Sequence, residues 1–341
     1  MMMTETMAAA VMTAAGEPLE IRDLPIPKPG PGEVLVRIEV CGLCHTDLHL
    51  WKGDQPIERD GPVILGHEGI GTVVELGPGV TRLKPGNRVG TGYVHATCGN
   101  CRECLTGHET HCASVECIGV NADGCFAQYA VFRESWATPI PARLEGAQAA
   151  PLLCAGVAAY SAIRKARLEP GELAVVFGVG GLGTYAIQIA RNHGARVAAV
   201  DISDEKLEHA RRMGADYTIR ADRDVASDIH ALGGANACFN FAPVAASWRQ
   251  MILAAAPRAR LVLISLPAES LRFEAAEIIE RGLLVMGNAD GTRQELRQIM
   301  ELAAADHVRS VVTRIPLRDI DKAFRRLASG GVTGRLVVDI P

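Results

Sequence analysis

The sequence predicts an α/β protein in which a domain of parallel βαβ units is inserted between two parts of an irregular, barrel-like β domain. Roughly the first 150 residues are rich in glycine and proline and contain short β-branched runs. After that point, apolar strand-like runs alternate with helical stretches, which is the pattern of a parallel sheet with crossover helices. Roughly the last 50 residues return to short strands around one helix.

The expected β domain spans residues 1–152. Its strand candidates are short, and turn signals such as PKPGPG and LKPGNRVG separate them. The candidates are EVLVRIEV (33–40), GTVVELG (71–77) and QYAVF (128–132). Together they predict a barrel-like arrangement.

The expected βαβ domain spans residues 153–288, and residues 289–341 then rejoin the β domain. A chain of 341 residues is long enough for roughly two such domains. The strand candidates of the inserted domain are LAVVF (173–177), RVAAV (196–200), ARLVLIS (259–265) and LLVMG (283–287).

Charge and composition exclude several classes of partner. The net charge of −4 provides no positive field for a phosphate backbone, and the chain has no run of lysine and arginine, so we expect no nucleic-acid partner. The N-terminal MMMTETMAAAVM lacks the cationic region of a signal peptide and is too short to span a bilayer. We therefore expect a cytoplasmic protein with no membrane partner, whose ten cysteines stay reduced.

Four cysteines form a dense cluster whose members are separated by two, two and seven residues: Cys98, Cys101, Cys104 and Cys112. Thiolates at this spacing can close a tetrahedron around Zn²⁺. An iron–sulfur cluster would use four cysteines equally well, although nothing else in the sequence suggests electron transfer. Because four thiolates leave no open position, the expected zinc is a structural ion.

The other cysteines have different expected roles. Cys117 and Cys238 are interpreted as buried small hydrophobic residues, and the roles of Cys41 and Cys125 stay open. Cys44 needs further ligands to form a metal site. The candidates are His67, in GHEGIG, and Cys154, in LLCAG, but the sequence alone does not bring them together.

A glycine-rich turn predicts a dinucleotide site. The motif GxGxxG follows the strand candidate LAVVF and precedes a helical stretch, and its residues are Gly178, Gly180, Gly181, Leu182 and Gly183. The glycines permit a tight turn and close approach to a pyrophosphate at a helix N-terminus. Asp201 ends the next strand, 18 positions beyond the last motif glycine, where it would accept hydrogen bonds from the adenosine ribose. The alternative is an ordinary βα turn with a solvated aspartate.

The helix that follows Asp201 has its own start and stop signals. Ser203 is expected to cap the helix DEKLEHARRMGA, which ends at Gly214.

These motifs together resemble the medium-chain zinc-dependent alcohol dehydrogenases, most closely the bacterial and yeast-type enzymes. The matching segments occur in the family's order and cover essentially the whole chain: CGLCHTDLHLWKGD, GHEGIG, the four-cysteine cluster, LCAGVAAY, VVFGVGGLG and GRLVVDI. The resemblance implies a GroES-like catalytic barrel, a Rossmann domain, and two zinc ions and NAD as cofactors.

The resemblance also implies roles for the residues of the first motif and its distant partners. Cys44, His67 and Cys154 would hold a catalytic zinc with an open fourth position. Glu68 would lie behind the metal as an occasional ligand or electrostatic tuner, and Asp47 would hold the other ring nitrogen of His67. Thr46 and His49 would form a proton relay that runs through the cofactor ribose.

Less specific positions concern the cofactor and the substrate. The alternatives to the proton relay are that the Thr46 hydroxyl is merely buried and that the His49 ring merely lies at the surface. The resemblance gives cofactor contacts for His45, Lys206, Leu266 and Arg335. It also gives Trp51 and Tyr93 as walls of the substrate pocket, although both would need no function as ordinary packed aromatic residues.

Three positions depart from the family's usual pattern. Ala158 lacks a hydroxyl that commonly touches the nicotinamide, Cys125 replaces a usual glycine, and Tyr93 stands where small-alcohol enzymes often carry tryptophan. These departures leave the expected reaction intact but bear on cofactor affinity and substrate range.

The expected function is therefore NAD-dependent interconversion of primary alcohols and aldehydes by a homotetramer or homodimer. Two alternatives remain open. One is a polyol, aryl-alcohol or formaldehyde-type dehydrogenase of the same superfamily, and the other is a non-catalytic protein that binds NAD and zinc.

Overall fold

The computed structural model describes residues 5–57, 59 and 61–341, and the chain divides into two compact units. The first unit contains the residues up to Cys154 and from Thr292 onward. The second contains Ala155–Gly291. The expected boundaries after residues 152 and 288 lie two and three residues before these divisions.

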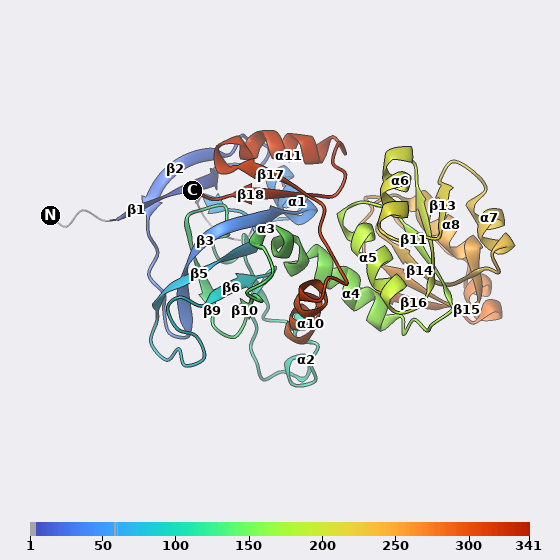
Figure 1. Cartoon of the computed structure of the whole chain (residues 1–341), viewed down its shortest axis with the longest axis horizontal. Coiled ribbons are helices and arrows are strands. Elements are labelled where there is room, and N and C mark those ends of the chain that lie inside the picture. The colour runs from blue at the N-terminus through green and yellow to red at the C-terminus, as the bar shows by residue number, and fades with distance from the viewer. Residues whose placement is uncertain (1–4, 58, 60) are drawn as a thin grey trace. The chain divides into compact units, whose positions relative to one another are not determined.

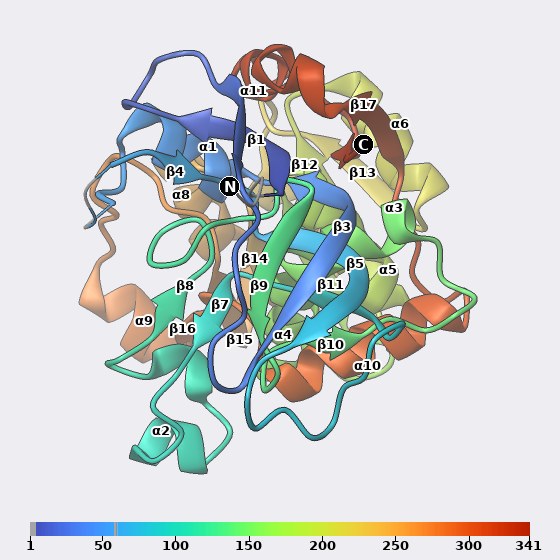
Figure 2. The same cartoon turned by 90° about the vertical axis from the view of Figure 1, so that its left-hand side faces the viewer.

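The first unit is built around a long strand, β3 (Glu33–Leu43), in a seven-stranded sheet. Both β5 and β9 pair with β3 in antiparallel register, and Figure 2 shows the three strands side by side. The C-terminal strand β18 also pairs with β3, so strands from the N-terminal and C-terminal parts of the sequence belong to one sheet. The other strands of this sheet are β5 (Glu68–Leu76), β6 (Arg88–Thr91), β9 (Tyr129–Arg133), β10 (Thr138–Pro139), β17 (Val312–Pro316) and β18 (Arg335–Asp339).

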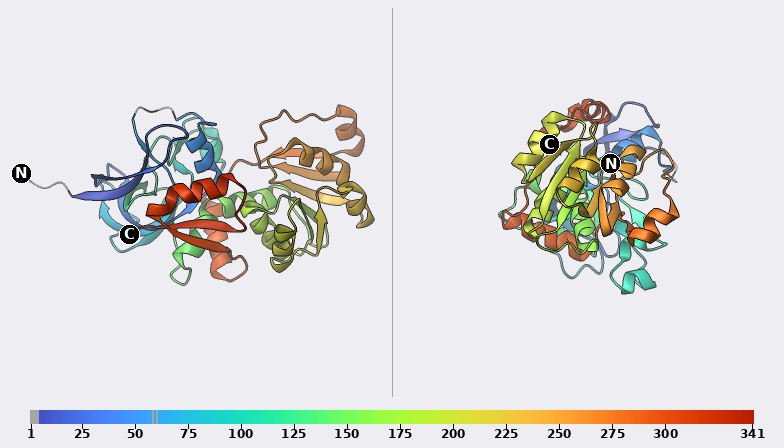
Figure 3. Two further views of the ribbon diagram at one scale, coloured as in Figure 1. Left: turned by 90° about the horizontal axis from the view of Figure 1, so that it is seen from above. Right: turned by 90° about the vertical axis from the view of Figure 1, so that its right-hand side faces the viewer.

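Smaller elements surround this sheet. A three-stranded sheet contains β1 (Thr6–Met12), β2 (Glu20–Pro25) and β4 (Val63–Ile64), and a two-stranded sheet contains β7 (Val94–Ala96) and β8 (Glu116–Cys117). The α-helices of the unit are α1 (His45–Lys52), α2 (Arg102–Leu105), α3 (Gly146–Ala149), α10 (Arg293–Ala304) and α11 (Ile320–Ala328). Three short 3-10 helices are η1 (Glu109–His111), η2 (Ala150–Leu153) and η3 (Leu317–Asp319). Seen from above, the red helix α11 lies beside the red strands β17 and β18 (Figure 3, left).

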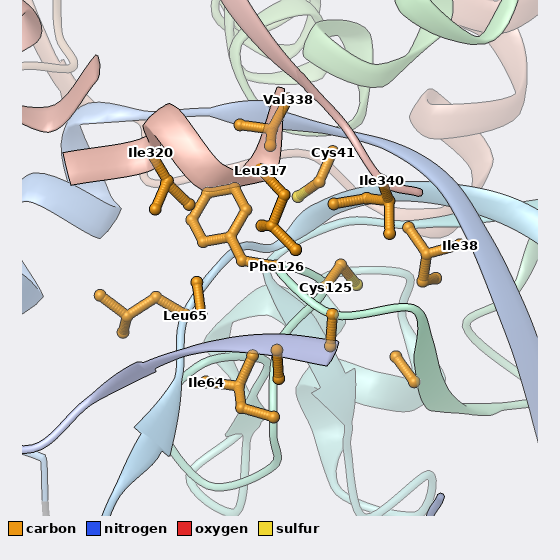
Figure 4. Close-up of a cluster of buried hydrophobic side chains, with 14 of the residues drawn as sticks. Ile38, Cys41, Ile64, Leu65, Cys125, Phe126, Leu317, Ile320, Val338 and Ile340 are labelled. Carbon is orange, nitrogen blue, oxygen red and sulfur yellow. The ribbon is translucent and has the colours of Figure 1, made fainter. Parts of the chain in front are cut away.

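The core of the first unit lies between its sheets and α11. Side chains from β3, β4, η3 and α11 meet there around Phe126, as the close-up in Figure 4 shows. The rings of Phe126 and Phe324 pack edge to face, with their centroids 6.0 Å apart. Residues far apart in the sequence therefore share one apolar interior, and burial of this surface stabilises the first unit.

The second unit is a doubly wound parallel sheet with strand order β13-β12-β11-β14-β15-β16. Its strands are β11 (Leu173–Phe177), β12 (Arg196–Asp201), β13 (Tyr217–Arg220), β14 (Ala235–Asn240), β15 (Ala255–Leu263) and β16 (Leu284–Gly287). Its helices are α4 (Ala155–Lys165), α5 (Gly181–Asn192), α6 (Asp204–Arg212), α7 (Val225–Ala231), α8 (Ala245–Ala254) and α9 (Ala275–Arg281). The central strand β11 is completely buried because helices cover both faces (Figure 1; Figure 3, right).

The order of the strands reverses at β11, which is the topological switch point of the sheet. The chain moves outward through β12 to β13 and then returns to β14 on the other side of β11. Right-handed crossovers therefore place α5 and α6 on one face and α7 and α8 on the other, as Figure 1 shows. Ligands of such sheets bind beyond the carboxyl end of the strands at this point.

The structure confirms the expected fold class and corrects one detail. The C-terminal part was expected to contain one helix, whereas the described residues after Thr292 form two α-helices, α10 and α11. Thr292 starts α10 with a capping box in which its hydroxyl accepts from the Glu295 amide and the Glu295 carboxylate accepts from the Thr292 amide. No single helix in the described part of the chain is long and apolar enough to cross a membrane, although α3, η2 and α4 would pass jointly on length and composition.

Candidate metal and dinucleotide sites

The structure brings Cys44, His67, Glu68 and Cys154 together in the first unit. One ligand atom from each lies within 4.8 Å of those of the others. Cys44 is the N-cap residue of α1, immediately after β3, and His67 directly precedes β5. Cys154 follows η2, so three loops at the ends of separate elements converge on one point.

The geometry of this cluster fits a tetrahedral zinc ion. The Cys44 and Cys154 Sγ atoms lie 3.8 Å apart. Two sulfurs bound to one zinc at about 2.3 Å, at tetrahedral angles, are separated by about 3.8 Å. Cys44 and His67 are buried, and Cys154 is half-buried.

The hydrogen bonds of His67 leave one ring nitrogen for a metal. Its Nδ1 lies 3.0 Å from Asp47 Oδ1, and a carboxylate oxygen accepts, so Nδ1 carries the proton. Its Nε2 is buried and has no hydrogen-bond partner among the described residues. A buried nitrogen lone pair without a partner costs free energy, and a metal ion would satisfy it.

Asp47 organises both sides of this loop. Its Oδ2 accepts from the Cys44 amide at 3.0 Å, and its Oδ1 also accepts from the Gly66 amide at 3.0 Å. Gly66 has a φ of +96°, a conformation that glycine adopts without steric cost. The fully buried Asp47 carboxylate therefore fixes the position of one sulfur ligand and the orientation of the histidine ligand.

The ionisation of the cluster agrees with a cation site. The hydrogen bond from Cys154, followed by the influence of His67, holds the pKa of the Cys44 thiol well below its ordinary value despite burial. Burial alone would lower the pKa of His67, but the Asp47 carboxylate and its hydrogen bond raise that pKa well above its ordinary value. The lowered pKa of Cys44 favours the thiolate, which is the form of cysteine that binds zinc.

Glu68 faces an arginine from the C-terminal strand. Arg335 Nη2 donates to Glu68 Oε1 at 2.6 Å and to Oε2 at 2.7 Å, and it also donates to the Leu43 carbonyl at 3.1 Å. Both side chains are buried. Burial raises the pKa of Glu68, and the Arg335 guanidinium opposes this effect and favours the ionised carboxylate. The expected cofactor contact Arg335 therefore has a carboxylate partner within its own unit, which sequence reasoning did not anticipate.

The residues of the expected relay lie on α1. Thr46 Oγ1 is 3.8 Å from Cys44 Sγ, which places the hydroxyl beside the metal cluster. His49 is half-exposed one turn further along the helix, and its Nδ1 lies 2.9 Å from Asp54 Oδ2. Because the carboxylate accepts, neutral His49 keeps its proton on Nδ1 and leaves Nε2 as the acceptor nitrogen. Asp54 was not among the expected site residues, and its separation of five residues from His49 is too common to signal a pair.

The four-cysteine cluster forms a separate site at the surface of the first unit. All four Sγ atoms of Cys98, Cys101, Cys104 and Cys112 lie within 4.8 Å of one another. Cys98 Sγ is 3.9 Å from Cys104 Sγ and 3.6 Å from Cys112 Sγ, close to the edge of one zinc tetrahedron. An iron–sulfur cluster distributes its thiolates over two or more iron atoms, so these short separations favour a single ion. The pKa of Cys98 is lowered to about 6, first by the Asn100 amide and then by the Cys101 amide.

The two expected pocket aromatics differ in their surroundings. The ring of Tyr93 meets the ring of His67 edge to face, with centroids 5.3 Å apart, so Tyr93 lies against the metal cluster. Trp51 instead belongs to the apolar core, where it packs against Phe324 and its Nε1 donates to the Glu17 carbonyl at 2.7 Å. The packing of Trp51 agrees with the alternative of an ordinary packed aromatic, and the roles of Trp51 and Tyr93 as pocket walls both stay predictions.

The glycine-rich turn has the geometry of a nucleotide loop in the second unit. Gly178 has a φ of +88°, and a Cβ at Gly183 would overlap the Gly178 carbonyl oxygen. Both positions therefore require glycine. Gly180 is the N-cap of α5, with open space where a side chain would lie, and Gly181 and Leu182 form the first turn of that helix. Amide groups at this helix start are available to an anionic ligand.

Asp201 is held directly against this turn. Its Oδ2 accepts from the Val179 amide at 2.7 Å, and its Oδ1 accepts from the Ser203 amide at 3.0 Å. The side chain is buried rather than solvated. Each oxygen keeps a lone pair for a further donor such as a ribose hydroxyl. Ser203 caps α6 as expected, with its hydroxyl accepting from the Lys206 amide.

The remaining expected residues occupy varied positions. His45 is exposed at the start of α1, Lys206 is half-buried in the first turn of α6, and Leu266 is 72% exposed after β15. Their cofactor contacts stay predictions. Cys238 is fully buried, as expected, and so are Cys41 and Cys125, whose roles the sequence left open. Cys117 was also expected to be buried, but this is wrong, because it is half-exposed on β8. Ala158 lies inside α4.

Comparisons with known proteins agree with both sites. Residues 30–142 match the family model described as alcohol dehydrogenase GroES-like domain, and residues 181–305 match the model described as zinc-binding dehydrogenase. An alcohol dehydrogenase of Rhizobium meliloti is 39% identical over 98% of this chain and 99% of its own length.

Solved structures show the same likeness in three dimensions. An alcohol dehydrogenase of the archaeon Aeropyrum pernix is 34% identical, covers 98% of this chain and 100% of its own, and has a TM-score of 0.91. A structure described as an NAD-dependent alcohol dehydrogenase is 31% identical with the same coverages and a TM-score of 0.92.

Proposed function

The chain belongs to the medium-chain zinc-dependent alcohol dehydrogenases, and from this membership we propose that it interconverts primary alcohols and aldehydes with zinc and NAD. The observation that carries the proposal is the buried cluster of Cys44, Cys154 and His67, whose three ligand atoms have zinc spacing and whose His67 Nε2 has no other partner in the described chain. A closed structural site needs a fourth strong ligand at this point. Here the fourth candidate, Glu68, is bound to Arg335 instead, which leaves a position for substrate.

Each residue around the cluster has a definable task. When bound, zinc would supply a Lewis acid for the alcohol oxygen and NAD would supply the hydride acceptor. Cys44, Cys154 and His67 would hold the metal, and Asp47 orients His67 and the Cys44 backbone. Tyr93 packs edge-on against His67 and excludes water from that side.

The residues that would carry the alcohol proton toward solvent lie on α1. The Thr46 hydroxyl lies beside Cys44 and would accept the proton from the alcohol. His49 Nε2 is the final acceptor near solvent, because Asp54 engages Nδ1. Asp54 would also stabilise the imidazolium that forms, since its carboxylate is 2.9 Å from the ring.

Preference for NAD over NADP is supported by the charges near Asp201. The Asp201 carboxylate lies where the adenosine ribose would bind, and it would repel a 2′-phosphate. Arg220 is the register partner of Asp201 in the neighbouring strand, but it forms ion pairs with Asp204 at 3.1 Å and Asp222 at 2.6 Å. Its charge is therefore already compensated. We expect a clear preference for NAD in kcat/KM with one alcohol, and equal efficiency with both cofactors would contradict the role of Asp201.

A panel of alcohols and aldehydes, assayed on protein of measured zinc content, tests the proposal. We expect turnover of primary alcohols with NAD that scales with zinc content. Preferred turnover of polyols, aryl alcohols or formaldehyde adducts would assign the chain to another branch of the superfamily. No NADH from any alcohol with fully zinc-loaded protein would favour a non-catalytic binding protein.

We also propose that the chain forms a homodimer or homotetramer in the cytoplasm. Strand β16 is an edge of the sheet of the second unit and pairs only with β15 among the described residues. Its Leu284 and Val285 are 55% and 38% exposed, and the neighbouring Ile279 is 76% exposed. An uncovered apolar edge strand favours pairing with a second copy, and a charge there opposes it. Sedimentation analysis should show Leu284→Lys shifted to a smaller species, and an unshifted assembly would place the interface elsewhere.

A further inference from the structure

Gly42 lies next to the metal cluster, on the central strand of the three paired strands β5, β3 and β18. It belongs to β3, where its register partner on β5 is Glu68 and its register partner on β18 is Val337. The Glu68 side chain starts on β5 and reaches Arg335, which lies on β18. Its carboxylate therefore passes over β3 at Gly42.

A side chain at position 42 would collide with Glu68, whose atoms are the nearest to that position. A Cβ at Gly42 would overlap Glu68 Oε2 and would lie 3.0 Å from both the Cβ and Cδ of Glu68, and these are the three nearest atoms. The conformation of the backbone does not call for glycine, because Gly42 is absent from the residues with positive φ. Glycine inside a strand lowers stability relative to alanine, so a steric reason is needed.

Gly71, a glycine on strand β5 of the same sheet, has a different reason. A Cβ at Gly71 would meet the backbone of Arg37 and Ile38, which is a constraint on strand packing. The obstacle at Gly42 is instead a single charged side chain that belongs to the metal cluster. Gly71 is therefore needed for strand packing, whereas Gly42 is needed for the position of a side chain in the metal cluster.

We propose that Gly42 is a positioning residue for Glu68: its bare Cα lets the carboxylate lie across β3 on Arg335, beside the metal ligands but held by another partner. A methyl group at position 42 would displace the carboxylate and leave Arg335 buried without it. Arg335 also donates to the carbonyl of Leu43, which directly precedes Cys44. The displacement would therefore disturb both the charge next to the metal and the segment that carries one of its ligands.

The functional consequence rests on the proposed zinc site, whereas the steric relation between positions 42 and 68 does not. Gly42→Ala is expected to release the zinc of the buried cluster to a chelator about 10-fold faster, as is usual for loss of a group that supports metal ligands. It should also shift the visible absorption of the cobalt-substituted protein, which a merely structural change far from the metal leaves unmoved. The zinc of the four-cysteine cluster should be retained.

Substitutions at Glu68 provide the matched comparison. In the Glu68→Ala background the obstacle is gone, so adding Gly42→Ala should change zinc release and melting temperature by little. Glu68→Gln keeps the size of the side chain and removes its charge, so Gly42→Ala should remain fully disruptive there. Gly331→Ala is the control for the substitution itself, because Gly331 is exposed and a Cβ there has no contact shorter than 3.5 Å.

Melting temperatures of the metal-free variants keep the test separate from the proposed function. If Gly42→Ala alone fails to fold, the double variant Gly42→Ala/Glu68→Ala should recover folded protein. Equal effects of Gly42→Ala in the Glu68→Ala and wild-type backgrounds would overturn the proposal. Absence of zinc from the buried cluster would instead contradict the proposed function and leave the steric coupling measurable.

Discussion

The first unit contains two thiolate clusters that would bind the same metal but are built in opposite ways. The four-cysteine cluster uses residues 98–112, takes all four ligands from one loop and lies mostly at the surface. The buried cluster takes Cys44 and Cys154 from positions 110 residues apart and adds one histidine. The first is a local site that encloses its ion, and the second exists only when the unit has folded.

This difference separates the roles of the two clusters. A closed set of four thiolates has no free position, so its binding energy contributes only to folding. The buried set has three ligands and a fourth candidate, Glu68, that Arg335 holds. A site that leaves one position open, and supports its histidine through Asp47, is suited to catalysis.

Loss of a ligand from the buried cluster should have the largest effect. Cys44→Ser is expected to reduce turnover to background, because the Lewis acid is lost, while the protein stays folded. Metal analysis should find about one zinc per chain in this variant. Retention of both zinc ions with normal turnover would break the distinction between the two clusters.

Loss of a ligand from the four-cysteine cluster should instead act on stability. Cys101→Ser is expected to lower the melting temperature by roughly 5–10 °C, because metal-binding energy at a closed site is folding energy. The half-exposed Cys117→Ser is the control, since Cys117 lies outside both clusters. Calorimetry that shows the same melting temperature for Cys101→Ser and the wild type would remove the structural role.

Weakening the support of His67 should have an intermediate effect. Asp47→Asn keeps the size of the side chain but removes the charge that orients His67 and accepts from two backbone amides. Metal affinity of the buried cluster or kcat should fall by about 10–100-fold. Competition with a chelator measures this, and the occupancy of the four-cysteine cluster should not change.

The smallest effect is expected at the end of the relay. His49→Gln should slow alcohol oxidation by about 10-fold at low pH, where external base is scarce, and by less at high pH. Added buffer base should partly restore the rate. Asp54→Asn tests the pairing with His49, and we expect a smaller loss of the same kind. A uniform loss without rescue by buffer would mean that His49 only packs or binds cofactor.

The sequence predicts the local site better than the distributed one for a physical reason. Cys98, Cys101, Cys104 and Cys112 are neighbours in the chain, so their spacing alone implies a shared ion. The glycine-rich turn and Asp201 are likewise separated by one helix of fixed length. In both cases the geometry follows from local structure.

The buried cluster depends on contacts that spacing does not encode. Cys44, His67 and Cys154 meet because β3, β5 and η2 pack together, and only the family resemblance could link them before the structure. The pairing of Glu68 with Arg335 joins residues 267 positions apart and was not anticipated. Trp51 packs in the apolar core, and its expected place in the substrate pocket stays a prediction.

An anomalous difference map at the zinc absorption edge, from crystals of the purified protein, tests the central claim most directly. The account predicts two zinc peaks per chain. One should be enclosed by four cysteine sulfurs, and the other should be bound by Cys44, His67 and Cys154, with its fourth position free of protein ligands and Glu68 still on Arg335. A single peak within the four-cysteine cluster, or a second ion closed by Glu68 as a permanent fourth ligand, would contradict it.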